Sequence, residues 1–152
     1  MKAGTAFTRE ERNFIESHRV ARLATADAQG RPHAVPIVYA LVDDVFYFIV
    51  DEKPKKTRRG LKRLRNIAVN PHTAVILDDY DEDWSRLAYL LVEGIAVQVD
   101  EPGLYDNVLQ ALRRRYPQYE RMPLTPERNP IVRITPTKRH FWRAHLGTPA
   151  RR

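Results

Sequence analysis

The alternation of apolar and polar positions along the chain predicts a series of short β-strands. The clearest is Val45–Val50, an uninterrupted apolar run whose aromatic and β-branched content is typical of a buried strand. Tight turns at Asp27–Gly30 and Asp43-Asp44 indicate that the first strands form an antiparallel meander. The remaining strands are expected at Val20–Ala26, Pro32–Leu41, Thr73–Leu77, Leu87–Val99, and Ile131–Ile134 with Lys138–Arg143, the last pair forming one strand that Pro136 can break.

Three segments have apolar residues every three or four positions, the spacing of one helix face. Thr8 and Glu11 have the form of a capping box, so a first helix is expected from Thr8 to about His18. The second helix follows the apolar run, with Thr57 as its expected N-cap. Its apolar face consists of Leu61, Leu64 and Ile67, and the third helix covers Leu104–Tyr116.

Six or so strands with three inserted helices predict a mainly β (α+β) fold, a closed antiparallel barrel and not a doubly wound sheet. Gly94, inside the long fifth strand, is expected at a bulge or bend that lets this strand serve two parts of the barrel. With 152 residues, no internal repeat and no dividing linker, residues 1–152 are expected to form a single domain.

Composition excludes several classes of protein. No run of about 20 apolar residues occurs, so no membrane-spanning helix is expected, and Met1–Phe7 lacks the apolar core of a secretory signal. Cysteine is absent, which excludes disulfides, thiolate metal sites and a cysteine nucleophile, and which fits a cytoplasmic protein.

Positive charge is concentrated just after the apolar run. The chain has 26 Lys and Arg against 19 Asp and Glu, a formal net charge of +7. The cations of this segment are Lys53, Lys55, Lys56, Arg58, Arg59, Lys62, Arg63 and Arg65. A helix N-terminus already favours anions, and these side chains add full charge, so the segment predicts a phosphate or polyanion site. A solvated basic helix and a nucleic-acid patch are the alternatives; nucleic acid is disfavoured because no known binding motif is present.

The usual catalytic motifs are missing, so an enzyme built on this chain would need a cofactor to carry the reaction. The histidines lack metal-ligand spacing and are each expected to be structural or solvated: His18, His33, His72, His140 and His145. The acidic segment Asp78–Asp83 is expected to be a solvated loop, with a metal site as the weaker alternative. Four aromatic residues can stack on a flat ring or belong to the core or an interface: Trp84, Tyr89, Phe141 and Trp142.

Taken in order, several segments resemble the pyridoxamine 5'-phosphate oxidase-like split β-barrel superfamily, and more narrowly its branch of coenzyme F420-dependent (deazaflavin-dependent) oxidoreductases. The likeness covers nearly the whole chain, in Arg22–Thr25, Asp27–Pro36, Val45–Val50, Arg65–Pro71, Asp83–Leu87, Val92–Gly94 and Lys138–Trp142. It implies a six-stranded antiparallel split barrel, the FMN-binding split barrel of Greek-key type. It also implies a homodimer that holds a flavin or deazaflavin in a groove between two barrels.

The resemblance also implies which residues would contact the cofactor. Phosphate or tail contacts fall to Lys53, Lys55, Lys56 and Arg63, with help from Thr57. The ring would be lined through backbone and apolar contacts by Val35, Pro36, Ile37 and Val38 of the second strand, and by Ile49, Val50 and Asp51. Trp142 stands where the oxidases place a cofactor-contacting Trp, and the facing subunit would supply Trp84, Arg86 and Tyr89.

Departures from the oxidase pattern argue against oxidation of a vitamin B6 phosphate. Pyridoxamine-phosphate oxidases carry Arg and Lys on the second strand, where this chain has His33 and Val38. Their C-terminal Arg-Leu-His-Asp-Arg is replaced by Arg143–Gly147.

The first functional hypothesis is therefore hydride transfer between coenzyme F420 and a small conjugated acceptor, with solvent, Tyr89 or His33 as proton donor. An FMN-dependent oxidoreductase and a non-catalytic protein that binds a flavin, a tetrapyrrole or nucleic acid are the alternatives.

Overall fold

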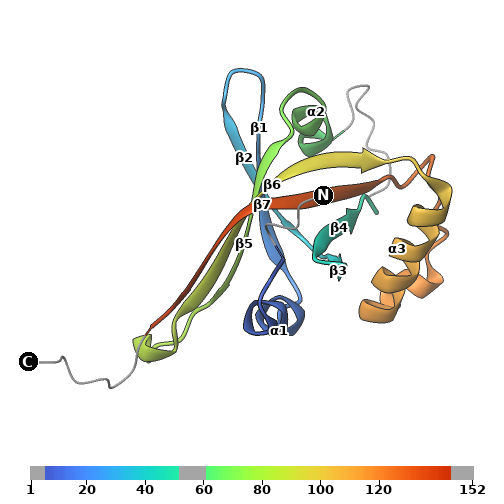
Figure 1. Cartoon of the computed structure of the whole chain (residues 1–152). Helices are drawn as coiled ribbons and strands as arrows, with labels where there is room; N and C mark the ends of the chain where they lie inside the picture. The colour runs from blue at the N-terminus through green and yellow to red at the C-terminus, as the bar shows by residue number, and fades with distance from the viewer. Residues whose placement is uncertain (1–5, 52–60, 145–152) are drawn as a thin grey trace, which may run out of the picture.

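The chain folds around one antiparallel sheet of seven strands that curls into an open barrel (Figure 1). This description comes from a computed structural model and covers residues 6–51 and 61–144. The strands lie in the order β2-β1-β5-β6-β7-β4-β3. Their bounds are β1 Ala21–Ala26, β2 Pro32–Ile37, β3 Ala40–Val42, β4 Val45–Ile49, β5 His72–Asp79, β6 Ala88–Val99 and β7 Ile131–Arg143.

Three α-helices pack against different parts of this sheet: α1 Arg9–Ser17, α2 Lys62–Val69 and α3 Pro102–Arg115. The predicted capping box is confirmed, because Thr8 Oγ accepts from the Glu11 N–H at 3.1 Å and Glu11 Oε1 accepts from the Thr8 N–H at 2.8 Å. Two 3₁₀ turns complete the fold, η1 Trp84–Arg86 and η2 Pro117–Arg121. Within the described residues, no helix combines the length and the apolar character needed to cross a membrane.

Two predicted boundaries are wrong. The second strand, expected over residues 32–41, is divided into β2 and β3, which makes seven strands instead of six. The division falls at Val38 and Tyr39, because the buried Tyr39 phenol reaches the carbonyl oxygens of Ile15 and His18 and draws the chain out of the strand. Helix α2 starts at Lys62 with Leu61 as its N-cap, later than predicted, and Thr57 lies outside the described residues.

The last strand runs unbroken from Ile131 to Arg143, so Pro136 does not interrupt it as predicted. The strand is instead bulged: Glu93 pairs with Lys138 and Gly94 with Pro136, which leaves Thr137 as the extra residue. The predicted irregularity at Gly94 is confirmed. A Cβ on Gly94 would lie 2.8 Å from Ile134 Cγ2 and 2.8 Å from the Thr135 carbonyl oxygen, so the close approach requires glycine.

Buried side chains form two clusters on opposite faces of the sheet. One contains α1, the inner residues of α2 and the barrel interior, with Leu23, Phe48 and Ile134 near its centre. The other joins α3 to the β3–β4 hairpin and the start of β7. Asp43 and Asp44 turn this hairpin with φ of 52° and 60°, the left-handed pair of a type I′ turn.

Candidate cofactor-binding site

The barrel is split between strands β2 and β4. In the described part of the chain β2 and β3 are the two edges of the sheet, and β3 covers β4 only from Val45 to Tyr47. Among the described strands, the later residues of β4 therefore pair only with β7, and β2 pairs only with β1. Alternate residues of such edges direct N–H and C=O groups away from the sheet, where a planar ring that carries amide groups can bind them.

Helix α2 bridges this split and brings cations to it. The buried Asn66 donates from Nδ2 to Thr25 Oγ1 of β1 at 3.0 Å, and Asn70 Nδ2 donates to the Asp27 carbonyl oxygen at 3.4 Å. On the other side the guanidinium of Arg63 lies 6.0 Å from the centre of the Phe48 ring on β4. The predicted phosphate residue Arg63 is thus half-buried beside the strand that precedes the basic segment.

The residues at the end of β4 make hydrogen bonds and packing contacts within the chain. The Val50 N–H donates to the Pro130 carbonyl oxygen at 2.9 Å, and the Val50 carbonyl oxygen accepts from Asn129 Nδ2 at 3.0 Å. The Ile49 side chain is buried in the cluster with α3. Asp51 Oδ2 accepts from the Tyr119 hydroxyl at 2.6 Å, and burial, followed by this carboxylate, raises the pKa of Tyr119. The Val50 backbone groups thus have hydrogen-bond partners within the chain, and ring contact by Ile49, Val50 and Asp51 stays a prediction from the sequence.

The predicted residues of the second strand divide between the two faces of the sheet. Pro36 is exposed on one face, whereas Val35 and Ile37 pack toward the core on the other. His33 pairs with Thr25, whose side chain is buried, so His33 also faces the core side. Val38 follows the strand and packs against the α3 cluster. Only the β2 edge and Pro36 remain accessible from the side that α1 does not cover.

Four predicted phosphate-site residues lie outside the described residues: Lys53, Lys55, Lys56 and Thr57. Their roles stay predictions from the sequence. The described structure locates only the positions on either side of them, at Asp51 and at Leu61.

The sheet face on which α3 packs is left uncovered by the described helices in its outer part, here called the open face. Cross-strand pairing places on it Pro36 and Ala34 of β2, Arg22 and Ala24 of β1, Ala74, Ile76 and Asp78 of β5, Tyr89, Leu91 and Glu93 of β6, and Lys138, His140 and Trp142 of β7. Helix α1 packs on the opposite face, where Glu11 pairs with Arg139 at 2.7 Å and Phe14 contacts Phe141. The small and apolar content of the open face is typical of a surface that packs against another protein surface.

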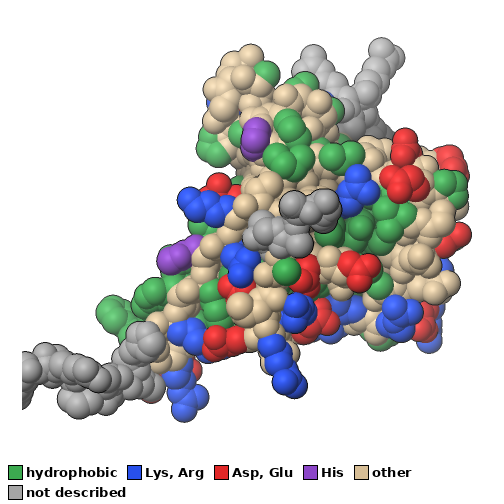
Figure 2. Space-filling model, viewed as in Figure 1, with side chains coloured by type: hydrophobic (Ala, Val, Ile, Leu, Met, Phe, Trp, Pro, Cys, Tyr) green, Lys and Arg blue, Asp and Glu red, His purple; other side chains and the backbone are tan. Residues whose placement is uncertain are grey.

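Aromatic residues gather at the outer end of this face. Tyr89 and Trp142 are cross-strand neighbours whose rings stack with centroids 5.8 Å apart, and the His140 ring lies 5.7 Å from that of Tyr89 in a tilted arrangement. Trp142 is 40% exposed and Trp84, in η1, is 68% exposed. Figure 2 shows exposed hydrophobic side chains at this tip, at its lower left. Arg86 is also exposed and lies 3.8 Å from Asp83.

The sequence analysis expected His140 to be solvated or structural, and it is exposed, but its position beside Tyr89 was not foreseen. His140 and Trp142 are two positions apart and therefore lie on the same face of the strand. Pairing of this strand with β6 then places both beside Tyr89.

One chain does not bring the predicted residues together. Phe48, beside Arg63, pairs with Val132, which pairs with Gln98 of β6. Tyr89 is nine positions from Gln98 along β6, which corresponds to about 30 Å. Arg63 and the predicted aromatic residues Tyr89 and Trp142 therefore lie toward opposite ends of the sheet.

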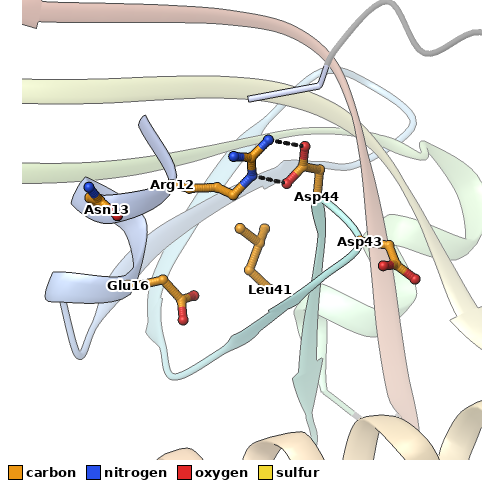
Figure 3. Close-up of a pocket in the computed structure, with 6 residues that line it drawn as sticks. All are labelled: Arg12, Asn13, Glu16, Leu41, Asp43 and Asp44. Carbon is orange, nitrogen blue, oxygen red and sulfur yellow. Dashed lines mark hydrogen bonds and ion pairs between the residues drawn. The ribbon is translucent and has the colours of Figure 1, made fainter. Parts of the chain in front are cut away.

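A surface hollow among the described residues lies elsewhere and does not suit an anionic cofactor. It has a volume of about 610 Å³ and is lined by Arg12, Asn13, Glu16, Leu41, Asp43 and Asp44 (Figure 3). Its arginine is already paired, with Arg12 Nε 2.9 Å from Asp44 Oδ1. None of the residues predicted for the cofactor site lines it. Within the described ranges, no three His, Cys, Asp or Glu side chains are grouped to hold a metal ion.

Comparison with known proteins agrees with this architecture. The family model described as pyridoxamine 5'-phosphate oxidase matches residues 7–143. A curated relative, 5a,11a-dehydrotetracycline/5a,11a-dehydrooxytetracycline reductase of Streptomyces rimosus, is 29% identical over 73 residues, which is 48% of this chain and 49% of that protein. The match thus spans about half the length of the relative.

Solved structures share the fold at low sequence identity. The conserved hypothetical protein Rv2991 of Mycobacterium tuberculosis has a TM-score of 0.72 and 24% identity, covering 99% of this chain and 94% of its own. An FAD-binding protein of Mesorhizobium loti has a TM-score of 0.65 and 20% identity over 87% and 89%. The haem storage protein HutZ of Vibrio cholerae has a TM-score of 0.68 and 16% identity over 91% and 95%.

The family match spans most of the chain, and the half-barrel, the split and the helices have the arrangement found in these structures. The chain therefore belongs to the pyridoxamine 5'-phosphate oxidase family of split β-barrels, an oxidoreductase and flavin-binding type of family.

Proposed function

We propose that this protein is an oxidoreductase that binds coenzyme F420 between two copies of the chain and passes a hydride to a small conjugated acceptor. The observation that carries the proposal is the separation of the two halves of the site. Arg63 and the β2 edge, which no other described strand pairs with, lie at the split, whereas stacked aromatics lie about 30 Å along β6 on the open face. Two copies packed through their open faces bring one chain's aromatics to the other chain's split.

The residues present fit a deazaflavin. A free β2 edge offers backbone N–H and C=O groups to the amide-like edge of the ring, and Arg63 with the neighbouring lysines offers positive charge to the anionic tail. The bound cofactor supplies the hydride. The protein supplies a site that excludes water, orients the ring and holds the acceptor against it.

F420 is favoured over FMN because its long polyanionic tail accounts for more cations than one phosphate requires. The dehydrotetracycline reductase relative supports reduction of a conjugated substrate as the reaction class. FMN is the second candidate, and the FAD-binding structural neighbour supports it. A cytoplasmic location stays a prediction from the sequence.

Titration of the purified protein with F420, FMN and haemin, followed by absorbance and fluorescence, tests the choice of cofactor. Saturable F420 binding with hydride transfer to a dehydrotetracycline or another enone supports the proposal. Tight FMN binding, with yellow protein absorbing near 450 nm, would favour the FMN alternative. A haemin Soret band without binding of either other cofactor would favour a non-catalytic tetrapyrrole-binding protein.

The phosphate assignment predicts a large effect of the double substitution Lys55→Ala, Lys56→Ala. Each charge-assisted hydrogen bond lost should cost about 1.5–3 kcal/mol of F420 binding. The control is Arg114→Ala, an exposed cation on α3 away from the split. Binding by the double variant as tight as the wild type's would remove these lysines from the site.

Subunit mixing tests whether two chains share one site. The variant Trp142→Ala lacks the aromatic half, and the lysine double variant lacks the cationic half. When the two are mixed and allowed to exchange subunits, each mixed dimer regains one intact site only if the halves come from different chains. Failure of the mixture to bind F420 better than either variant alone would contradict the shared site.

A further inference from the structure

We infer that His140 donates the proton when the acceptor is reduced. The His140 of one chain would serve the acceptor bound at the split of the other chain. This inference rests on the proposed function and adds the group that completes the reaction. His140 is exposed, lies on the open face and is part of the aromatic cluster with Tyr89 and Trp142.

Reduction of a conjugated acceptor needs both a hydride and a proton. The acceptor takes a hydride from the reduced cofactor at its β-carbon, and the electrons of the C=C bond move toward the carbonyl oxygen. The adjacent α-carbon then takes a proton from the imidazolium of His140. One C=C π bond is lost, two C–H bonds form, the acceptor gains two electrons and the cofactor loses two. The neutral imidazole regains its proton from solvent, to which it is exposed.

The other proposed donors fit this role less well. His33 faces the core side of β2, beside buried Thr25, so it is turned away from the open face. Tyr89 is on the open face, but its ring already stacks on Trp142 and contacts His140. Imidazole is also the side-chain type that changes its charge closest to neutral pH, which suits a general acid.

The charged and titratable groups that face His140 come from four strands. They are Tyr89 and Glu93 of β6, Lys138 of β7, Asp78 of β5 and Arg22 of β1. Glu93 stands directly across the strands from Lys138, so two side chains of opposite charge share the open face near His140.

The test is the pH profile of kcat/KM for the F420-loaded dimer of His140→Gln, compared with His72→Gln. His72 is an exposed histidine on the same sheet face but at the other end of β5. A general acid must be protonated, so wild-type kcat/KM should fall as pH rises through the titration of His140. His140→Gln should lose that alkaline limb and about 10²-fold in kcat/KM, with unchanged F420 affinity. His140→Lys should restore activity with the limb moved to higher pH.

A second readout does not depend on turnover. Imidazole signals of His140 in NMR spectra of the ¹⁵N-histidine-labelled protein should shift when F420 is added, and those of His72 should not. If F420 binds but the His140 signals stay unchanged, or if His140→Gln keeps the wild-type pH profile, the inference is overturned while the proposed function stands. A wild-type protein that binds no F420 overturns the proposed function, and the inference with it.

Discussion

The two ends of the β6–β7 ribbon have the same backbone structure and very different surroundings. At the inner end, residues 95–99 and 131–135, both faces are used by the chain itself, one by the barrel interior and the other by α3. At the outer end, residues 88–93 and 138–143, α1 covers one face and the open face carries exposed aromatic and basic residues. The inner end therefore maintains the fold, and the outer end is available for a second chain and a ligand.

The largest effect on stability should come from the inner end. Ile134 is fully buried between Ala96 and Phe46, so Ile134→Ala should lower the free energy of unfolding by about 4 kcal/mol. Leu91 is half-exposed at the outer end, so Leu91→Ala should lower the free energy of unfolding by less than half as much as Ile134→Ala. Urea denaturation at one fixed protein concentration measures both, and equal losses would contradict the contrast between the ends.

The covered face of the outer end should be nearly as sensitive. Arg139 Nε lies 2.7 Å from Glu11 Oε1, and the side chain of Glu11 is only 9% exposed. Glu11→Gln keeps a residue at N3 that can complete the capping box, but it leaves Arg139 without its charge partner. The free energy of unfolding should fall by about 3 kcal/mol. Glu10→Gln removes an exposed partner of Arg143 and should cost at most about 0.5 kcal/mol. Thermal melts of the two variants should differ clearly.

The two ends of the ribbon meet at Gly94, and a substitution there should have a smaller effect on stability. Gly94→Ala places a methyl group 2.8 Å from Ile134 Cγ2 and from a carbonyl oxygen, which should cost about 2 kcal/mol. Gly103→Ala has open space around it and serves as the control. If both variants unfold at the same urea concentration, the close packing at Gly94 is not what holds the bend.

On the open face, function should change more than stability. Trp142→Ala loses a stacked neighbour of Tyr89 and should cost no more than about 1 kcal/mol in unfolding. It should nevertheless weaken self-association and F420 binding, as measured by sedimentation velocity and fluorescence titration. If Trp142→Ala unfolds much more easily but still binds F420, the outer end maintains the fold and does not bind the ligand.

The smallest expected effect lies at the β1–β2 turn, outside the ribbon. A hydrogen bond from the Arg31 guanidinium, with backbone N–H groups, lowers the pKa of Asp27 to about 2. Because the folded-state pKa lies below the unfolded value, this carboxylate stabilises the fold above about pH 4 and loses its contribution as the pH falls toward about 2. Asp27→Asn should therefore narrow the difference in urea midpoint between about pH 5 and about pH 2.5.

Much of the fold could be predicted from local patterns, because strands, caps and turns depend on nearby residues. The capping box at Thr8, the turn at Asp43-Asp44 and the irregularity at Gly94 all follow from residue types with strong backbone preferences. The division of the second strand could not be predicted, since it depends on Tyr39 reaching the end of α1 from a distant part of the chain.

The candidate site was predicted less completely, because it depends on which residues become neighbours across strands. The sequence indicated Tyr89 and Trp142 but not that His140 lies beside them. It also suggested Val50 as a ring contact, without the knowledge that Asn129 and Pro130 already bind its backbone. Hydrogen bonds between segments 79 residues apart leave no local pattern in a sequence.

The single extra residue Thr137 has a consequence for the shape of the ribbon. Up to Pro136 the even-numbered residues of β7 face the interior, and after Thr137 the odd-numbered ones do. Without Thr137 the alternation would be regular, and the later residues would keep their present faces, with His140 and Trp142 on the open face and Arg139 and Phe141 inward. The extra residue therefore changes the local twist and bend of the ribbon, not the set of side chains that reaches the open face.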